Sequence, residues 1–593
     1  MAVRFHYLVA FAMLASPLFA VPRLRLSQTV IGPISVAQGG SPEAQEIEVL
    51  SVDDAGVNAE TASLRPTFSS TAPWVSAAAS PVRNCTKREG QCIPVRFSFA
   101  SQQLQAGTYS ATVTITDANA LDAPQPVLVM LTVGSNVPGS AAFFVAPNGS
   151  SDEVKFSTNG PLTATWNTQS GGDWLSLVQL GAGSYDFVVP SSIRVKHLDG
   201  MAEATYNGTV RVQNAKFAGD NKNVSVSMRV TSQPIAAWGR DTLRIRLAKD
   251  STKLSQTLRI GNRGLGTLTV SGVTSTMATG TGWLAAEQFQ NLPFATLTFD
   301  TASVAPGIYK GNVAVASNAV NSPVNLPVEL EVVPQGAPFV RYRGIIENAA
   351  FQEGDAVANG GIVAAFGEQL SYEQAQSNKA LPLPVEMGGA KVFVNDKQAP
   401  LFFTSYNQIN FQIPYDTPPG EARVRVDRGS QRGNTVTVKV VSSAPKFLRL
   451  QLRAAGINIS EDRDFFGIAV NASDGTFSLP KEFGIPNSRP SKKGEVIVLY
   501  GLGMGPTIPP VREGEAAPNT PARVASDLLR VFFGAQALST GAQTDALFAG
   551  LTPGLVGLYQ VNVQIPEDSP TGDVAVRIQL DQAASEYAFI AVE

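Results

Sequence analysis

The sequence predicts an all-β chain of about five tandem immunoglobulin-like sandwiches, and three observations lead to this fold class. Gly and Pro are frequent, at 52 and 39 residues, while charged residues make up only 16% of the chain, which suits strands and turns. Short runs with alternating apolar side chains are bounded by Gly or Pro, and no helical period separates them. A chain of 593 residues also exceeds what one hydrophobic core serves, so several domains are expected.

Three segments repeat one pattern, a Trp before an aliphatic residue, then a strand that opens with Tyr, then a Val-rich strand. The tryptophans are Trp74, Trp174 and Trp283, and the tyrosines are Tyr109, Tyr206 and Tyr309. In the first Tyr strand, residues 109–115, apolar side chains alternate with Ser110 and Thr112. One face of that strand is therefore expected to be buried and the other to be wet.

The last part of the chain contains a sharper repeat. Residues 408–420 return as 560–572, and a strand with a glycine turn precedes each copy, at 362–367 and 496–501. A proline ends the repeated strand in both copies because it cannot donate to the sheet ladder. The duplicated unit is therefore a whole domain.

These patterns divide the chain into six segments. They are a signal peptide at 1–20, three sandwiches at 21–134, 135–233 and 234–334, and two related sandwiches at 335–443 and 444–593. The linkers near Gly134, Gln233 and Pro334 are short, which favours a semi-rigid rod.

The amino terminus predicts export. Arg4 and His6 precede an apolar run that reaches Leu14, and the stretch Ser-Pro-Leu-Phe-Ala at 16–20 that follows places cleavage after Ala20. No later segment has the roughly 20 uninterrupted apolar residues of a transmembrane helix, so the mature chain is expected to be extracellular or at the cell surface, without a membrane span.

The only two cysteines, Cys85 and Cys92, flank a turn-like stretch. In an oxidising compartment they are expected to close a small loop as a disulfide, and two unpaired thiols are the alternative. A lone pair lacks the four ligands of a structural zinc site, so no metal is predicted.

Charge and motifs argue against several classes of ligand. The formal net charge is −3, and no basic cluster suits a phosphate backbone, so nucleic acid is not an expected partner. The glycine run at 501–505 superficially resembles a dinucleotide-binding turn, but Pro506 takes the place of its last glycine and residues 507–510 cannot begin a helix. No cofactor is predicted.

Candidate catalytic groups are scarce. Besides His6 the chain has one histidine, His197, which lies in a charged stretch and is interpreted as a solvated residue. Glu461, Asp462 and Asp464 could ligate calcium, but a solvated turn is favoured because the spacing lacks a calcium-loop signature. The chain is therefore predicted to be no enzyme, and no catalytic residue is assigned.

Aromatic and amide side chains give the remaining candidates for a site. The three repeated tryptophans could form sugar-stacking platforms, but burial in the core is favoured. Trp166 and Trp238 stand outside the repeat and are candidate ligand-contact residues. Equivalent amides in the two terminal sandwiches could share a polar site, although satisfying turn backbone is favoured. These amides are Asn410, Gln412, Asn562 and Gln564.

The three amino-terminal segments resemble BACON domains, bacterial sandwich modules often attached to carbohydrate-active proteins. The third carries the resemblance best, in Trp283-Leu284, in Pro-Gly-Ile-Tyr-Lys-Gly at 306–311 and in Asn-Ser-Pro-Val at 321–324. The first two match more loosely, because each lacks one glycine beside its tyrosine. The resemblance implies a glycan-binding or spacer role.

Residues from about 340 to 593 resemble a carboxy-terminal domain family that recurs in Solibacter-type Acidobacteria and has no established activity. Three strings carry this resemblance, at 406–414, 494–506 and 547–560.

Together these observations predict a non-catalytic binding or interaction protein outside the cell, with a glycan or a surface protein as its partner. A purely structural stalk or matrix spacer is the alternative. An unrecognised extracellular hydrolase is a minor one, since the chain has almost no histidine.

Overall fold

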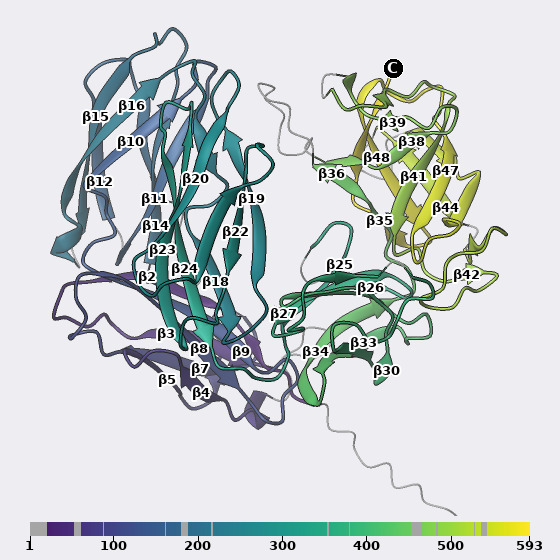
Figure 1. Cartoon of the computed structure of the whole chain (residues 1–593), viewed down its shortest axis with the longest axis horizontal. Helices are drawn as coiled ribbons and strands as arrows, with labels where there is room; N and C mark the ends of the chain where they lie inside the picture. Colours follow the sequence, from purple (N-terminus) through teal and green to yellow (C-terminus); the bar gives the residue numbers. More distant parts are fainter. Residues whose placement is uncertain are drawn as a thin grey trace, which may run out of the picture.

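The computed structural model describes residues 21–593 except 52–60, 87, 160–161, 180–187, 215–216, 353–354, 379, 452–464, 482–483, 527 and 535–541. In these residues strands form nearly every element, beside two short 3-10 helices, η1 (Thr61–Ser63) and η2 (Ala218–Asp220). The strands pair into sheets that pack face to face around five main cores, so the predicted fold class is confirmed (Figure 1). The predicted signal peptide at 1–20 lies outside the described residues.

The first sandwich, strands β1 to β9, packs two sheets around a core that includes Ile47, Val95 and Val113. Its strand β2 pairs in parallel with its last strand, β9. The first sheet holds β1 (Arg25–Leu26), β3 (Gln45–Leu50), β7 (Gln91–Phe99), β5 (Val75–Ala79) and β6 (Arg83–Asn84). The second holds β2 (Val30–Val36), β9 (Gln125–Val133), β8 (Gly107–Thr116) and β4 (Thr67–Ser70).

The second and third sandwiches repeat the parallel pairing of an early strand with the last one, β10 with β16 and β18 with β24. The second has sheets of β10 (Ser140–Val145), β16 (Lys222–Val230), β15 (Thr205–Asn214) and β12 (Leu162–Thr168), and of β11 (Ser151–Asn159), β14 (Val188–Lys196) and β13 (Leu175–Gln179). The third has sheets of β17 (Ala236–Trp238), β19 (Leu254–Asn262), β22 (Phe294–Phe299) and β21 (Leu284–Gln288), and of β18 (Leu243–Ala248), β24 (Val324–Val333), β23 (Gly307–Ser317) and β20 (Val270–Met277).

The fourth sandwich packs two five-stranded sheets. They are β25 (Phe339–Glu347), β27 (Ile362–Glu368), β32 (Gln408–Gln412), β31 (Leu401–Thr404) and β28 (Gln376–Ser377), and β26 (Val357–Ala358), β34 (Gln431–Val441), β33 (Gly420–Arg428), β29 (Ala390–Val394) and β30 (Lys397–Gln398).

The fifth sandwich is larger. Its first sheet holds β40 (Ser488–Arg489), β39 (Phe477–Ser478), β38 (Ala469–Asn471), β41 (Val496–Leu502), β47 (Tyr559–Gln564), β46 (Phe548–Leu551), β43 (Arg523–Val524), β42 (Thr507–Ile508) and β35 (Lys446–Phe447). Its second holds β36 (Arg449–Gln451), β37 (Phe465–Gly467), β50 (Ala588–Val592), β48 (Gly572–Leu580), β44 (Leu529–Phe533), β45 (Ala542–Asp545) and β49 (Ala583–Ala584).

The repeated tryptophans belong to the cores. Trp174 and Trp283 are 2% and 0% exposed, and Trp74 is 7% exposed. In the second and third sandwiches the glycine two places after the tyrosine makes room for the tryptophan, because a Cβ on Gly208 would lie 3.3 Å from Trp174 and one on Gly311 would lie 3.1 Å from Trp283. The sequence pattern is thus a packing unit, and the alternative of a sugar-stacking platform at these three positions is wrong.

The repeated tyrosines close a local corner. In each of the first three sandwiches the hydroxyl donates to the backbone carbonyl four residues earlier, as in the tyrosine corner of immunoglobulin folds. The pairs are Tyr109 with Gln105 (2.8 Å), Tyr206 with Ala202 (3.0 Å) and Tyr309 with Ala305 (2.8 Å).

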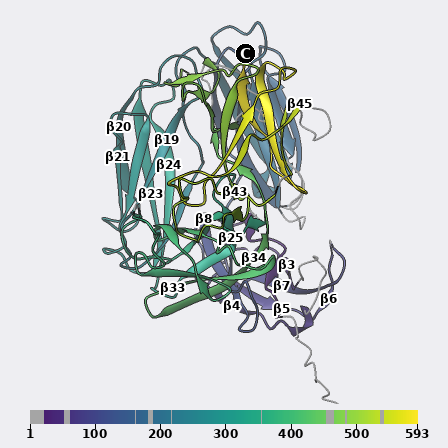
Figure 2. The ribbon, with the colours of Figure 1, turned by 90° about the vertical axis from the view of Figure 1, so that its right-hand side faces the viewer.

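The five sandwiches do not form the rod that the short linkers favoured. The first sandwich lies across one end of the second and third and beside the fourth, while the fifth stands on the fourth (Figure 1). Figure 2 shows β34 of the fourth sandwich beside the strands of the first. The chain therefore folds back, and sandwiches that are distant in sequence share interfaces.

Candidate functional site

A cavity of about 600 Å³ lies where the first, third and fourth sandwiches meet. The first sandwich contributes residues of β8, β9 and the β1–β2 connection, the third contributes β18 and β24, and the fourth contributes β25 and β27. Small-molecule sites have volumes of roughly 300–1,000 Å³ and often lie between domains. We call this space the junction cavity.

Ion pairs of the third sandwich form one wall. Arg244 and Arg246 on β18 are in register with Glu329 and Glu331 on the parallel strand β24. The nitrogen-to-oxygen distances are 3.6 Å for Arg244 to Glu329 and 3.2 Å for Arg246 to Glu331. Because residues two apart share a face of a strand, all four side chains lie on the same side of this sheet.

Hydroxyl groups of the first sandwich meet these carboxylates. Ser110 Oγ donates to Glu329 Oε1 at 2.5 Å, and Thr112 Oγ1 donates to Glu331 Oε2 at 3.1 Å. The face of β8 that was expected to be wet is therefore covered at Ser110 and Thr112, which are buried. The expectation is wrong here because the third sandwich, far away in sequence, packs on that face.

The fourth sandwich contributes a bulged strand. Between the pairs Val340 with Gly367 and Ile345 with Ala365, four residues of β25 stand opposite one residue of β27. Such bulges redirect side chains and are frequent next to functional sites. Three of the four bulged residues, Arg341, Tyr342 and Arg343, line the junction cavity.

The bulge includes a strained residue. Arg343 has a φ of 53°, in the left-handed region that side chains other than Gly, Asn and Asp seldom occupy. Gly344 follows it at a close approach, because a Cβ there would lie 2.5 Å from the Phe366 carbonyl oxygen. The guanidinium carbons of Arg25 and Arg343 lie 4.9 Å and 5.3 Å from the centre of the Tyr342 ring.

Burial raises the pKa of Glu368, the carboxyl that connects the third and fourth sandwiches. Its Oε2 accepts from Arg246 at 2.8 Å, and the positive charges of Arg246 and Arg341 oppose the effect of burial on the pKa. A second contact joins the same sandwiches, since the Ala248 amide donates to the Tyr406 hydroxyl at 2.6 Å. Each carboxylate on the cavity wall therefore also holds an ion pair or an interface.

The two tryptophans assigned as candidate ligand contacts lie apart from the junction cavity. Trp166 on β12 is 45% exposed, at the edge of a sheet in the second sandwich. Trp238 on β17 is half-buried against the core of the third, and its Nε1 is buried without an acceptor among the described residues. Of the two, Trp166 offers the more accessible ring.

The sequence interpretation of His197 is wrong. The side chain is 6% exposed rather than solvated, and its Nδ1 accepts from the Gly149 amide at 3.2 Å. Residue 149 precedes β11 and residue 197 follows its partner strand β14, so the ring joins the two ends of the pair. The acidic group Glu461, Asp462 and Asp464 lies outside the described residues.

Of the repeated amides, the two glutamines bond backbone groups, as expected, whereas the two asparagines bond side chains. Gln412 donates to the Gly360 carbonyl at 3.0 Å and accepts from the Gly514 amide of the fifth sandwich at 2.7 Å. Gln564 donates to the Gly494 carbonyl at 2.8 Å. Asn410 and Asn562 instead accept from Gln408 and Gln560, two residues earlier on the same strand.

The glycine run at 501–505 serves the connection between the fourth and fifth sandwiches. Cβ atoms on Gly503 and Gly505 would lie 2.3 Å from the carbonyl oxygens of Ala444 and Ser442, respectively. The glycines therefore allow two backbone segments to approach closely, and β42 rather than a helix follows them.

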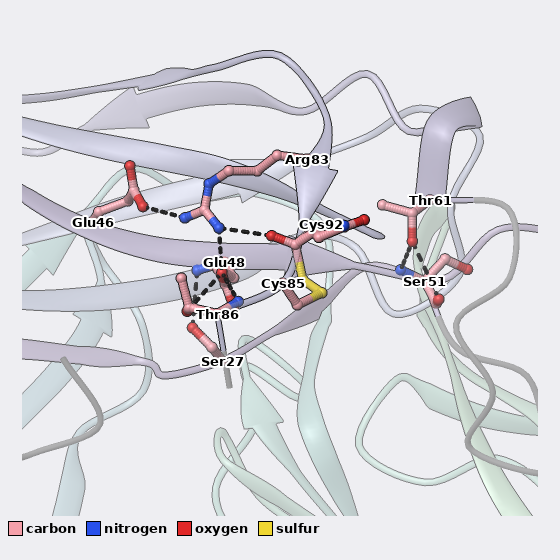
Figure 3. Close-up of a disulfide and its surroundings, with 10 residues drawn as sticks. Ser27, Glu46, Glu48, Ser51, Thr61, Arg83, Cys85, Thr86 and Cys92 are labelled. Atoms are coloured by element: carbon pink, nitrogen blue, oxygen red, sulfur yellow. Dashed lines mark hydrogen bonds and ion pairs between the residues drawn. A yellow bond between two sulfur atoms is a disulfide. The ribbon is translucent and has the colours of Figure 1, made fainter. Parts of the chain in front are cut away.

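Cys85 and Cys92 are joined by a disulfide (Figure 3). Glu48 lies beside it, and all three ligand atoms are within 4.8 Å of one another. The glutamate accepts from the Thr86 amide at 2.8 Å and from Arg83 at 3.1 Å. Sulfurs joined in a disulfide offer no thiolate to a metal. We therefore interpret the contacts of Glu48 as stabilising the disulfide loop.

No protein-family model matches the chain, and no curated protein sequence matches it. The BACON and Solibacter-type resemblances rest on the quoted residues and stay predictions, as do the segment limits.

Similar solved structures include two β-rich ectodomains and one enzyme. Drosophila N-cadherin domains 1–4 share 13% identity over 70% of this chain and 99% of that one, with a TM-score of 0.19. Human desmocollin-1 shares 10% over 95% and 98%, with a TM-score of 0.15. An endo-fucoidan hydrolase of glycoside hydrolase family 107 shares 15% over 53%, at a TM-score of 0.19, and the chain spans 45% of it. Scores this low carry no inference about ligand or activity. Among the described residues no helix is long and apolar enough to cross a membrane.

Proposed function

We propose that this chain is an extracellular, non-catalytic binding protein that contacts a glycan or a surface protein through surfaces formed between its sandwiches. One observation carries the proposal: the first sandwich is held against both the third and the fourth, around a cavity of about 600 Å³. The export signal expected at the amino terminus and the disulfide both support an extracellular location.

The folded-back arrangement favours binding over a spacer role. A spacer needs contacts only between consecutive modules, and its length comes from a linear arrangement. Here the Ser110 hydroxyl of the first sandwich donates a hydrogen bond to Glu329 of the third, 219 positions away in the sequence. Contacts of this kind shorten the molecule and instead create shared surfaces.

The chemistry of the cavity supports a non-catalytic role. Glycoside hydrolysis needs two carboxyl groups that are free to act on the substrate. Glu329 and Glu331 accept hydrogen bonds from the first sandwich, and Glu368 accepts one from Arg246. The one histidine among the described residues, His197, belongs to the second sandwich, which contributes no residue to the cavity lining, and it is engaged with backbone.

The proposal is tested by measuring binding of residues 21–593 to an array of neutral and acidic glycans and to an array of immobilised surface proteins. We expect specific binding to at least one class, at the same level in Trp238→Phe. A comparison with Trp166→Ala then shows whether the exposed tryptophan contributes. Absence of all binding would favour the spacer function.

A separate measurement tests the proposal that the chain is not an enzyme. We expect no release of reducing sugar from the polysaccharides that bind. Release that disappears in Glu368→Gln but persists in the exposed-site variant Glu287→Gln would show that the chain is a hydrolase.

A further inference from the structure

The most unusual local feature of the junction cavity is that two of its arginines have no carboxylate partner. Within the described part of the chain, Arg244 and Arg246 have carboxylate partners, whereas Arg341 and Arg343 form no ion pair. Both of these side chains are exposed. The cavity wall thus holds four arginines against three glutamates, and the excess of positive charge lies on the bulge of β25.

The bulge exists at an energetic cost. A left-handed conformation is unfavourable at an arginine, and four residues of β25 leave the regular ladder. Contacts from another sandwich hold it, since Arg25 of β1 lies over the Tyr342 ring while pairing with Asp122. Strain that is maintained by surrounding contacts is typical of positions that present side chains to a ligand.

The opposite wall offers one acceptor to a ligand that carries hydroxyl groups. Glu331 Oε1 is buried and has no hydrogen-bond donor among the described residues, although its Oε2 is engaged. A buried acceptor without a donor is unfavourable, so a donor arriving from a ligand is favoured there. The cavity therefore combines two guanidinium groups that form no ion pair on one side with one carboxylate oxygen that lacks a donor on the other.

We propose that the junction cavity binds an acidic saccharide, with Arg341 and Arg343 holding its carboxylate or sulfate group and Glu331 accepting from a sugar hydroxyl. The planar fork of arginine matches both anions through paired hydrogen bonds. A volume of about 600 Å³ suits a ligand of one or two sugar units. This inference rests on the proposed binding function and names the ligand class and the site.

The test uses calorimetric titration of residues 21–593 with digalacturonate, with its neutral methyl ester and with a sulfated disaccharide. We expect the acidic sugars to bind at least about tenfold more tightly than the methyl ester, and more weakly as salt is raised. Preference for digalacturonate or for the sulfated sugar identifies which anion the forks accept.

Three variants locate the site. Arg341→Gln and Arg343→Gln should each weaken binding of the preferred acidic sugar by at least about tenfold, equivalent to about 1.4 kcal/mol. Arg211→Gln, an exposed arginine of the second sandwich, should bind as the unaltered chain does. Unchanged melting temperatures show that the variants are folded, as expected for exposed side chains.

The outcomes separate the two proposals. Acidic sugars that bind equally well to Arg341→Gln and Arg343→Gln would place the site elsewhere and overturn this inference, while the binding function stands. Equal affinity for digalacturonate and its methyl ester would also overturn it. If the titration detects no binding of any saccharide and the array is positive for surface proteins only, the saccharide inference is wrong. The proposed binding function would still stand.

Discussion

Asp122 in the first sandwich accepts a hydrogen bond at Oδ1 from the backbone amide of Thr437 in β34, 2.9 Å away and 315 positions later in the chain. The Asp122 amide in turn donates to the Thr435 carbonyl at 2.9 Å, so backbone and side chain both join the fourth sandwich. Burial raises the pKa of this carboxyl, and the charge of Arg25 opposes that effect. This contact holds the first and fourth sandwiches together beside the junction cavity.

Substitution of Asp122 should loosen that interface. In Asp122→Ala the Thr437 amide and Arg25 lose their shared acceptor, so hydrogen exchange at residues 435–437 should be faster by at least about tenfold, as for loss of a charge-assisted hydrogen bond. Exchange measured by mass spectrometry on peptides of β34 checks this. Asp241→Ala, an exposed site in the third sandwich, is the control, and equal exchange in both variants would contradict the prediction.

Glu495 should contribute stability that depends on pH. The bidentate contact with Arg489, at 2.6 and 3.0 Å, is the main reason why its pKa is lowered from 4.5 to about 2. A carboxyl with a lowered folded pKa stabilises above its unfolded pKa, and the stability is lost as the pH falls from 4.5 towards about 2. Glu495→Gln should therefore lower the free energy of unfolding by about 2 kcal/mol at pH 7 and by much less near pH 2.

Calorimetry from pH 2 to 8 measures this difference on the transition of the fifth sandwich. Asp568→Asn, at an exposed carboxyl of the same sandwich, is the control. A Glu495→Gln effect that stayed constant across this range would show that the ion pair is not its cause.

Gly311 should be far less tolerant than Gly272 in the same sandwich. An added methyl at Gly311 would lie 2.7 Å from the Thr276 carbonyl oxygen and 3.1 Å from Trp283, whereas at Gly272 it would meet nothing within 4 Å. Gly311→Ala should lower the free energy of unfolding by about 2 kcal/mol, as overpacking does, and Gly272→Ala should be nearly neutral. Thermal unfolding followed by tryptophan fluorescence compares them, and equal losses would argue against packing of Trp283 as the cause.

The disulfide should stabilise the first sandwich. Closing the short loop between Cys85 and Cys92 is expected to contribute about 2.5 kcal/mol through the entropy of the unfolded chain. Reductant should therefore lower the unfolding temperature of the unaltered chain and leave Cys85→Ser/Cys92→Ser unchanged. A variant as stable as the oxidised chain would contradict this reasoning.

Local patterns explain why the fold class was predictable. The alternation in residues 109–115 and the Trp, Tyr and Gly positions act within one sandwich, where strand periodicity decides which side chains enter the core. The amides of Gln412 and Gln564 bond carbonyls of their own sandwiches, at Gly360 and Gly494, although these partners are 52 and 70 positions away in the sequence.

The candidate site could not be predicted from local sequence patterns. Ser110 and Thr112 follow the pattern of a solvated face, and only the third sandwich packing on them changes their environment. Arg341 to Gly344 have no motif of their own, because a bulge is defined by the register of β25 against β27 rather than by its sequence.

The series of β-sandwiches follows from local sequence, because burial of every second side chain needs information only from neighbouring residues. The return of the first sandwich to the third and fourth, and the charged cavity between them, arise only in the folded molecule. Those interfaces depend on pairs such as Asp122 with Thr437, whose partners become neighbours only when complete sandwiches dock.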